Sequence, residues 1–302
     1  MDIGIALPQW GRHASPEAIV QVAQQAERLG YASLWVQERL LRPTHPRSGY
    51  GGMPDQPWPE PYRTVYDPIE TLTYVAARTE RIKLGTSVID ALFHVPVVLG
   101  RRLATLDRFS GGRVIVGLGQ GWSDEEFQTA NVPPSRRGAG FEEFITAMRA
   151  VWGPDPVSFS GRFYQIPESE IGPKPVQPGG PPILVGAFAP TALERAGRIA
   201  DGLNPIGLSW EMLAGMVAAF NEAARAAGRN PDALQIVVRA NNQVSDGPLG
   251  DDRGPFSGSV DQIRGDLQKA EEMGLNHIFF DLGFVETPVD RQLRFLEDLK
   301  SG

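Results

Sequence analysis

Residues 81–122 read RIKLGTSVIDALFHVPVVLGRRLATLDRFSGGRVIVGLGQGW, and this segment decides the fold. An apolar run at 82–89 and a second one at 113–119 each have the length and composition of a β-strand. Between them, residues 97–109 show the apolar spacing of an amphipathic helix. Glycines close the second run, and glycine allows a ligand to approach the backbone closely. The segment therefore predicts a strand–helix–strand unit with a ligand site at its strand ends.

The same alternation extends through the whole chain of 302 residues. Further strands are expected at 3–7, 33–38, 182–188, 202–207, 234–244 and 277–282. Further helices are expected at 16–29, 68–79, 141–152, 191–199, 211–227, 260–273 and 289–299. Ser15, Asp67 and Ser259 stand immediately before three of these helices, as N-cap residues do. The pattern predicts eight strand–helix pairs.

The composition of the strands indicates how they are arranged. They are apolar without regular alternation, which is typical of strands buried on both faces of a parallel sheet. Eight such units fit a single (β/α)8 TIM-barrel domain over residues 1–302. A doubly wound sheet is the alternative, but it usually has fewer strands and a switch point. No break in composition divides the chain into two domains.

Composition also argues against several classes of protein. The chain has no cysteine, so it has neither a disulfide framework nor a cysteine nucleophile. No apolar run approaches the ~20 residues that span a bilayer, and the N-terminus lacks the basic start of a signal peptide. The formal net charge is −7, and no basic stripe is present. We expect a cytoplasmic enzyme that binds neither nucleic acid nor a membrane.

Two insertions are longer than ordinary connections. Residues 41–66 contain six prolines and four aromatic residues, and residues 153–182 contain eight prolines. Both predict ordered coil or lids. The first insertion follows the second strand, so it is expected on the face where TIM-barrel active sites are found. The second follows a helix and is expected to begin on the opposite face.

Three residues near strand ends are candidates for acid–base or electrostatic roles. Glu38 and Arg39 end the second strand, where barrel enzymes place functional side chains, and a salt bridge on the rim is the alternative. His94 follows the third strand and titrates near neutral pH, although a lone histidine is more often structural. Histidines and carboxylates do not show the spacing of metal ligands, so no metal is expected.

Glycines and aromatic residues add a second group of candidates. GLGQG at 117–121 superficially resembles a dinucleotide-binding loop, but residues 122–134 have the composition of a loop where a helix should follow. Either these glycines admit a flat or phosphorylated ligand, or they fit the curvature of the barrel. The small-residue turn before Pro190 suits a phosphate or is an ordinary turn. Trp10, Tyr62 and Trp122 predict an aromatic mouth for a planar cofactor and an apolar or mixed substrate, whereas Trp35 is expected in the core.

Together these features resemble the luciferase-like monooxygenase family of flavin and deazaflavin oxidoreductases. The resemblance covers about residues 3–299. Its carriers are AERLGYASLWVQE (26–38), TERIKLGTSVI (79–89), LATLDRFSGGRVIVGLGQGW (103–122), Arg136 with Arg137, and PPILVGAFAPTALERAGRIADG (181–202). The resemblance implies a TIM barrel, in agreement with the independent strand count. It also implies a bulge in the third strand with a non-proline cis peptide at Ser87–Val88.

The resemblance further implies which residues surround a cofactor ring. Those in contact with the ring would be Thr86, Ser87 and Val88. Those that flank it would be Gly119, Gln120, Gly121 and Trp122. Those near the phosphate-bearing tail would be Gly186, Ala187 and Phe188. Trp10 and Tyr62 are the expected substrate contacts.

The expected chemistry is hydride transfer between the deazaflavin coenzyme F420 and a small organic substrate. The TSVI bulge and the GLGQG turn look most like those of F420-dependent members. An FMN-dependent monooxygenase fed by a separate reductase is the alternative within the family, and a homodimer is expected by resemblance. A non-catalytic flavin-binding barrel, or a metal-free isomerase or lyase using Glu38 and His94, are alternatives of other classes.

Two positions depart from the family pattern. Glu38 is followed by Arg39, where many members have a histidine. We therefore expect Arg39 or a substrate group to supply electrostatic stabilisation. Trp122 stands where the sugar-phosphate dehydrogenases of the family carry a glutamate, which argues against that subgroup. The loops at 41–66 and 246–258, which would select the substrate, lack recognisable motifs.

Overall fold

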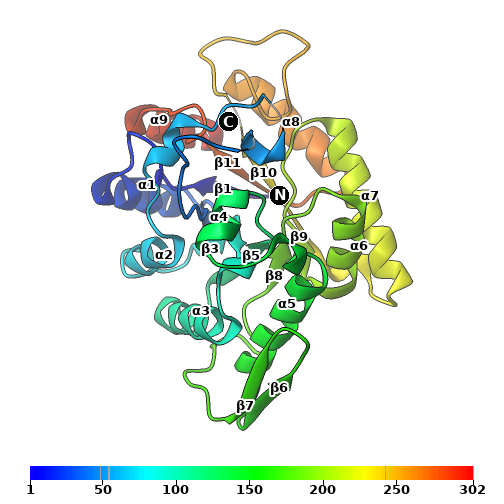
Figure 1. Cartoon of the computed structure of the whole chain (residues 1–302). Coiled ribbons are helices and arrows are strands. Elements are labelled where there is room, and N and C mark those ends of the chain that lie inside the picture. Colours follow the sequence, from blue (N-terminus) through cyan, green and yellow to red (C-terminus); the bar gives the residue numbers. More distant parts are fainter. Residues whose placement is uncertain (48, 54, 242, 302) are drawn as a thin grey trace.

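The computed structural model describes residues 1–47, 49–53, 55–241 and 243–301, and its centre is a closed barrel of parallel strands (Figure 1). In these residues the barrel strands are β1 (Asp2–Ala6), β2 (Ser33–Val36), β3 (Lys83–Thr86), β4 (Ile89–Asp90), β5 (Val114–Gly119), β8 (Ile183–Val185), β9 (Gly202–Leu203), β10 (Gln235–Asn241) and β11 (His277–Asp281). They pair in the order β3–β2–β1–β11–β10–β9–β8–β5–β4, and an additional β3–β5 pairing closes the ring. β3 and β4 share one barrel position, so the predicted TIM barrel is confirmed and the doubly wound alternative is wrong.

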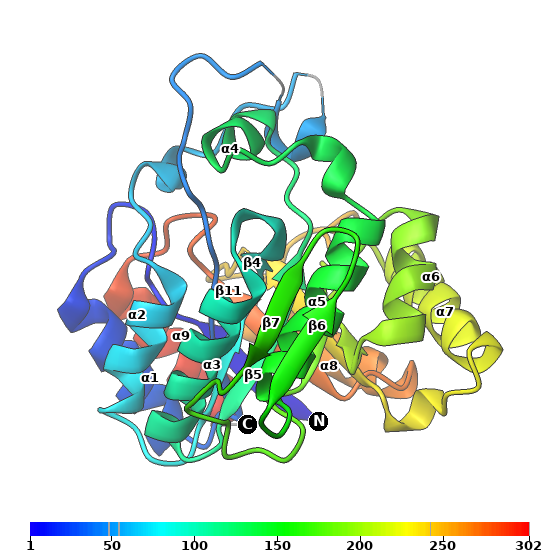
Figure 2. The ribbon, with the colours of Figure 1, turned by 60° about the horizontal axis from the view of Figure 1, so that its bottom comes forward.

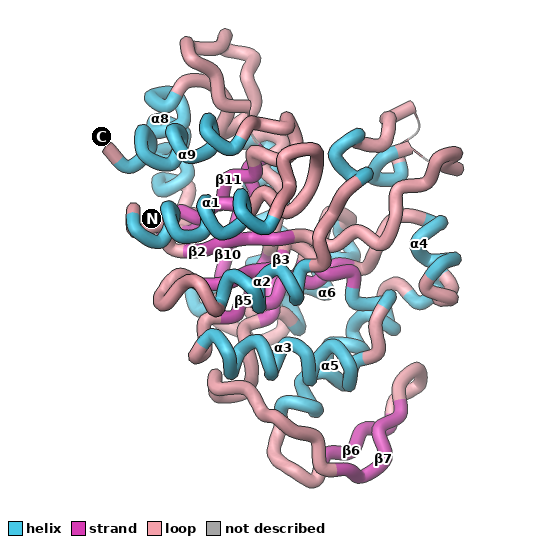
Figure 3. Tube along the Cα trace, turned by 90° about the vertical axis from the view of Figure 1, so that its left-hand side faces the viewer, coloured by secondary structure: helices cyan, strands magenta, loops and turns pink. Residues whose placement is uncertain are grey.

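Helices cover the outside of the barrel and alternate with its strands in the chain. They are α1 (Pro16–Arg28), α2 (Pro68–Ala76), α3 (Pro96–Ser110), α5 (Ala139–Trp152), α6 (Pro190–Ile199), α7 (Trp210–Ala226), α8 (Val260–Glu272) and α9 (Val289–Lys300). Figure 3 shows α1, α2 and α3 in a row in front of the strands. Ser15, Asp67 and Ser259 each accept a backbone hydrogen bond from the first turn, which confirms the predicted N-caps. None of the helices in the described ranges is long and apolar enough to cross a membrane.

The barrel interior is filled by side chains. The rings of Trp35 and Phe279 stack inside it with their centroids 4.6 Å apart, which confirms the core position expected for Trp35. At the opposite end from the strand C-termini, Ser33 Oγ accepts a hydrogen bond from Trp35 Nε1 at 2.7 Å and lies 2.7 Å from His277 Nε2. Burial lowers the pKa of His277 to about 4, so this imidazole is neutral at pH 7.

The third strand is interrupted at Ser87 and Val88, and the peptide bond between them is cis, as the resemblance implied. Thr86 and Gly117 join the two strands beside this break. Thr86 Oγ1 donates to the Gly117 carbonyl at 2.9 Å and accepts from the Gly117 amide at 2.9 Å. A Cβ added to Gly117 would lie 2.0 Å from the Thr86 carbonyl oxygen. The close approach of these two backbones therefore requires glycine at position 117.

The insertion at 41–66 passes over the C-terminal end of the barrel, on the face predicted for it (Figure 2). It contains short 3₁₀ turns at Tyr50–Gly52 and Glu60–Arg63. Its end is attached to the turn after β1, because Trp10 and Val65 form an antiparallel bridge. The Tyr66 amide also donates to the Gln9 carbonyl at 2.9 Å. This attachment places the aromatic residues of the insertion above the strand ends.

Two other segments differ from expectation. Residues 153–182 contain an antiparallel hairpin of β6 (Val157–Ser160) and β7 (Gln165–Ser169), because these residues pair with each other instead of remaining coil. The hairpin lies outside the barrel against α5, where the Phe144 and Tyr164 rings are 5.6 Å apart. Residues 122–134, expected as a loop, contain α4 (Asp124–Thr129) with Ser123 as its N-cap.

The contact between Gly117 and Thr86 beside the strand break can be tested by substitution. We expect Gly117→Ala to lower the free energy of unfolding by about 2 kcal/mol or more, because the added methyl group meets backbone that cannot move away freely. Gly215→Ala is the matched control, since an added Cβ there, on the exposed side of α7, meets nothing within 4 Å. We expect the control to leave stability unchanged or raise it by up to about 1 kcal/mol. Urea unfolding measures both, and equal midpoints would contradict the assigned role of Gly117.

Candidate active site

The C-terminal ends of the barrel strands surround a site that we call the mouth. Ser87 and Val88, at the break in strand three, form one wall of it. The Ser87 carbonyl accepts a hydrogen bond from Arg239 Nη1 at 2.9 Å, and the Val88 carbonyl accepts one from the Glu38 amide at 3.1 Å. Ser87 Oγ donates to Asn204 Oδ1 at 2.6 Å. Contacts from β10, β9 and the end of β2 therefore fix this backbone.

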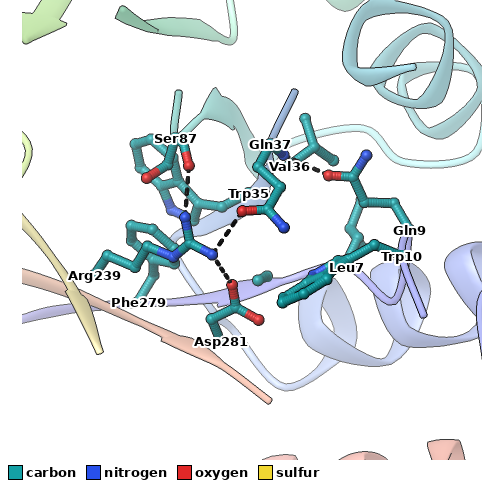
Figure 4. A pocket seen from close by; sticks show the side chains of 11 residues that line it. Leu7, Gln9, Trp10, Trp35, Val36, Gln37, Ser87, Arg239, Phe279 and Asp281 are labelled. Atoms are coloured by element: carbon teal, nitrogen blue, oxygen red, sulfur yellow. Dashed lines mark hydrogen bonds and ion pairs between the residues drawn. The ribbon is translucent and has the colours of Figure 1, made fainter. Parts of the chain in front are cut away.

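Arg239 occupies the centre of the mouth (Figure 4). Its Nη2 donates to Asp281 Oδ2 at 2.5 Å and to Gln37 Oε1 at 2.7 Å, and its Nε donates to Asn241 Oδ1 at 2.9 Å. Burial alone would lower the pKa of Arg239, but Asp281 raises it above the ordinary value. The guanidinium is therefore permanently charged and paired with a carboxylate.

Glu38 and His94 form a pair on the second strand's side of the mouth. Glu38 Oε1 lies 2.7 Å from His94 Nε2, and Glu38 Oε2 accepts from the Asp90 amide at 2.8 Å. Burial lowers the pKa of His94, but the hydrogen bond to Glu38 and the charge of Glu38 together outweigh it, so the pKa lies above its usual value. Both carboxylate oxygens of Glu38 are therefore occupied by residues that follow the strand break.

Arg39 lies between two buried carboxylates. Its Nη2 is 2.8 Å from Asp90 Oδ2, and its Nε is 3.0 Å from Glu126 Oε1. Burial raises the pKa of Asp90 to about 6 and that of Glu126 to about 7, although Arg39 opposes both shifts. Asp90 also accepts from the Gly121 amide at 3.1 Å, and Glu126 from the Leu40 amide at 2.8 Å. This cluster connects strand two, the strand break and α4.

Aromatic side chains cover the mouth, and we call them the aromatic cap: Trp10, Tyr50, Trp58, Tyr62, Trp122 and Phe284. They form a cluster separate from the main core. The Arg39 guanidinium lies 5.6 Å from the centroid of the Tyr62 ring and 5.1 Å from that of Trp122. The predicted substrate residues Trp10 and Tyr62 are thus in contact, with ring centroids 5.1 Å apart.

Beneath the aromatic cap a cavity of about 10 Å³ remains, which is room for one water molecule. Its lining includes Leu7, Trp10, Gln37, Arg239 and Asp281 (Figure 4). A cofactor ring or a substrate enters this space only if cap residues move. Open hollows of about 440 and 630 Å³ lie on the surface beside the 41–66 segment.

The three segments expected around a cofactor ring converge on one side of the mouth. Asp90 and Gly119 are register partners between β4 and β5, and the Gly186 amide donates to the Leu118 carbonyl at 2.9 Å. A Cβ added at Gly119 or Gly186 would lie 2.6 or 3.2 Å from the Val88 side chain. These glycines make room for Val88, so the fit of the barrel explains them without a ligand.

Other predicted residues on this side lie at its edge. Gln120 Oε1 accepts from the Gly138 amide at 2.7 Å, which attaches the strand end to the start of α5. Ala187 is buried, whereas Phe188 is 48% exposed. α6 begins directly afterwards with Pro190 and has no side-chain N-cap bond. An exposed aromatic side chain can contact a flat ring, and the free backbone N–H groups of an uncapped helix start can bind an anionic tail on that ring.

Several polar residues at the mouth were not predicted from the sequence: Gln37, Asp90, Glu126, Asn204, Arg239 and Asp281. Two of them carried a signal, because Arg239 interrupts the apolar run IVVRAN and Asp281 ends the run IFFD. Charges inside buried strands are rare unless they are paired. Within residues 1–47, 49–53, 55–241 and 243–301, no group of three or more histidine or acidic side chains could hold a metal ion.

Proteins with similar sequences include named oxidoreductases. An uncharacterized protein of Mycobacterium tuberculosis (strain ATCC 25618 / H37Rv) is 35% identical over 207 residues, which is 67% of this chain and 71% of that protein. The F420-dependent glucose-6-phosphate dehydrogenase of Nocardia farcinica is 30% identical over 78% of this chain and 68% of its own length. The FMNH(2)-dependent dimethylsulfone monooxygenase of Pseudomonas putida is 29% identical over 73% of this chain and 56% of its own.

Solved structures share the fold over almost the whole chain. The monooxygenase RslO1 from Streptomyces bottropensis has a TM-score of 0.81 at 22% identity, with 99% of this chain and 98% of that chain covered. The coenzyme F420-dependent tetrahydromethanopterin reductase from Methanopyrus kandleri has a TM-score of 0.78 at 17% identity, with 99% and 97% covered. At these identities the likeness concerns the fold alone.

The family itself follows from a match to the sequence model of luciferase-like monooxygenases. This match extends over residues 1–248, which include the strand break, the GLGQG turn and the start of α6. Two of the relatives above are named as oxidoreductases that depend on F420 or on reduced FMN. The chain belongs to the luciferase-like monooxygenase family.

Proposed function

We propose that the protein binds F420 at the mouth and catalyses hydride transfer between this deazaflavin and a small organic substrate. The observation that carries the proposal is the convergence of residues 86–88, 119–122 and 186–188 on one side of the mouth. The F420-dependent dehydrogenase among the relatives supports it. No metal or second protein domain is needed for this reaction.

The residues of the chain position the reactants in this proposal. Bound F420 would supply the hydride chemistry, since a deazaflavin carries a hydride and forms no useful oxygen adduct. Ser87 and Val88 would back the ring with a backbone that Arg239 and Glu38 hold from behind. The start of α6 would bind the anionic tail. The aromatic cap would exclude water, because only about 10 Å³ remain beneath it when it is closed.

We propose a positioning role for Arg39. The sequence led us to expect electrostatic stabilisation from its charge. Asp90 and Glu126 compensate that charge, and the side chain is only 5% exposed. Arg39 also lies against Tyr62 and Trp122. The arrangement favours a role in holding the aromatic cap over the strand ends.

FMN is the second candidate cofactor, in a monooxygenase that uses oxygen and reduced flavin from a separate reductase. A relative named for FMNH(2) favours it, because the same segments would back a flavin ring. We also propose a homodimer, by resemblance to the family, which size-exclusion chromatography with light scattering tests. Glu38 and His94 would carry an isomerase or lyase reaction only if neither cofactor binds.

Titration of the purified protein with F420 and with FMN tests the proposal. We expect F420 to bind with a shift in its absorbance spectrum and a dissociation constant at least tenfold below that of FMN. Tighter binding of FMN would favour the monooxygenase. Binding of neither cofactor would refute an oxidoreductase function. Tight binding without turnover of any substrate would favour a non-catalytic flavin-binding barrel.

The buried carboxylate of Glu126 gives the fold a pH dependence. Its pKa is about 7 in the folded protein and about 4.3 in an unfolded chain. Between these values the folded state keeps a proton that the unfolded state releases, so stability falls as the pH rises from about 4.5 to 7. Asp90, with a pKa of about 6, adds to the same trend.

We expect Glu126→Gln to reduce the decrease in the free energy of unfolding between pH 5 and pH 8 by on the order of 2–3 kcal/mol. The amide oxygen of the variant still accepts from the Leu40 amide. Glu125→Gln, at a half-buried position of the same helix, is the matched control. Burial raises the pKa of Glu125, but its hydrogen bonds outweigh this and lower the pKa, so the variant should keep the wild-type slope between pH 5 and pH 8. Urea unfolding at both pH values measures the difference. Equal pH slopes for wild type and Glu126→Gln would show that Glu126 is not the titrating group.

A further inference from the structure

We propose that the substrate is a small uncharged molecule with an aromatic or other apolar body and one carbonyl or hydroxyl oxygen, and that Gln37 binds this oxygen. The inference rests on the proposed function, because it concerns the side of the mouth that the cofactor would leave free. Three observations carry it: an unpaired donor on Gln37, the pairing of both buried arginines of the mouth with carboxylates, and the aromatic cap.

Gln37 presents a buried hydrogen-bond donor without a partner. The residue is 7% exposed, and its Nε2 has no hydrogen-bond partner among the described residues. The orientation of the amide is fixed by chemistry, since Arg239 can only donate and Gln37 Oε1 accepts from it at 2.7 Å. Nε2 therefore points away from Arg239 into the cavity beside Trp10 (Figure 4). A buried donor left unpaired is unfavourable, and a ligand oxygen that accepts from it would remove this cost.

Gln9 shows that this free donor is specific to Gln37. Both glutamines line the same cavity, and Gln9 is fully buried. Gln9 Nε2 donates to the Tyr66 carbonyl at 2.5 Å, and Gln9 Oε1 accepts from the backbone amide of Gln37. Both ends of Gln9 are therefore used in the fold, whereas Gln37 keeps one donor for a ligand.

The donor faces the β1 and β11 side of the mouth. Gln37 follows β2, Trp10 follows β1, and Asp281 ends β11, and these strands are neighbours in the barrel order. Of the segments expected around the ring, residues 119–122 and 186–188 follow from β5 and β8, whereas residues 86–88 lie between β3, the other neighbour of β2, and β4. A ring held against Ser87 and Val88 on the β5 and β8 side would thus leave Gln37 Nε2, which points toward Trp10, facing a second molecule.

The charges at the mouth select against an anionic substrate. Arg39 is paired with Asp90 and Glu126, and Arg239 with Asp281. The two buried arginines of the mouth are thus each matched by at least one buried carboxylate. A phosphate group binds most strongly to donors whose charge is not already compensated. These two arginines offer no such donor to glucose 6-phosphate, for which some relatives are named.

The aromatic cap supplies the surface for the apolar body. Trp10 lines the cavity, and the Trp10 and Phe284 rings lie 5.6 Å apart, edge to face. Tyr50 and Tyr62 add hydroxyl groups that lie 3.2 Å from each other. The substrate would displace cap residues of the 41–66 segment toward the open hollow beside them. A flat apolar molecule regains the aromatic contacts that this displacement breaks.

Calorimetric titration of the F420-loaded or FMN-loaded protein with acetophenone, benzyl alcohol, toluene and glucose 6-phosphate tests the proposal. We expect the two oxygen-bearing aromatic probes to bind at least tenfold more tightly than toluene, and glucose 6-phosphate not to bind. Gln37→Glu keeps the oxygen that accepts from Arg239 and replaces the donor by an acceptor. We expect it to weaken both oxygen-bearing probes at least tenfold while toluene binding and cofactor affinity stay unchanged.

Gln21→Glu, on the exposed face of α1, makes the same chemical change away from the mouth and should leave all titrations unchanged. Equal affinity of wild type and Gln37→Glu for the oxygen-bearing probes would overturn the role of Gln37, with cofactor binding intact. Weaker cofactor binding by Gln37→Glu would also overturn it, because the donor would then serve the ring. Tight binding of glucose 6-phosphate, or no binding of either oxygen-bearing probe, would overturn the substrate class. Failure of the wild type to bind F420 and FMN would instead refute the proposed function itself.

Discussion

The buried guanidinium of Arg239 is the interaction on which the mouth depends. From β10 it contacts the Ser87 carbonyl at the strand break, Asp281 on β11 and Gln37 after β2. One planar cation thereby fixes three other positions of the barrel. A lysine could not replace it, since its single ammonium lacks the fixed fork of donors that reaches several acceptors. Asp281 makes the burial of this charge tolerable, because an unpaired buried cation would cost several kcal/mol.

The two buried arginines of the mouth hold different parts of it. Arg239 holds the backbone that would lie behind a cofactor ring, while Arg39 lies between α4 and the aromatic cap. Both are compensated by carboxylates, so neither offers a free cation. In the proposed function, such a site would position its ligands and favour uncharged groups. Specificity would then come as much from the missing free charge as from the contacts that are present.

Much of the fold was predictable because it depends on local patterns. Helical spacing and N-caps at Ser15, Asp67 and Ser259 marked the elements, and eight repeats marked the barrel. α4 was missed because only six residues are helical, with glycines shortly before them and prolines shortly after, although Ser123 followed three residues later by Glu126 is a capping signal. The break at residues 87–88 came from the family resemblance and not from any local pattern. Arg39 and His94 were visible as strand-end residues, but their partners are 51 and 56 residues away in the chain.

The polar floor of the mouth could not be predicted for a related reason. Gln37 belongs to a strand-end run in which Glu38 and Arg39 appear chemically more active. Its importance arises only when Arg239 takes one end of its amide and leaves the other end free. The aromatic cap was also hard to predict from the sequence, because its members come from four separate segments. It packs as a small cluster apart from the main core, and such a cluster opens at a lower free-energy cost than the barrel below. In the proposed function, the same apolar contacts would exclude water from the mouth and select the molecules that displace the cap.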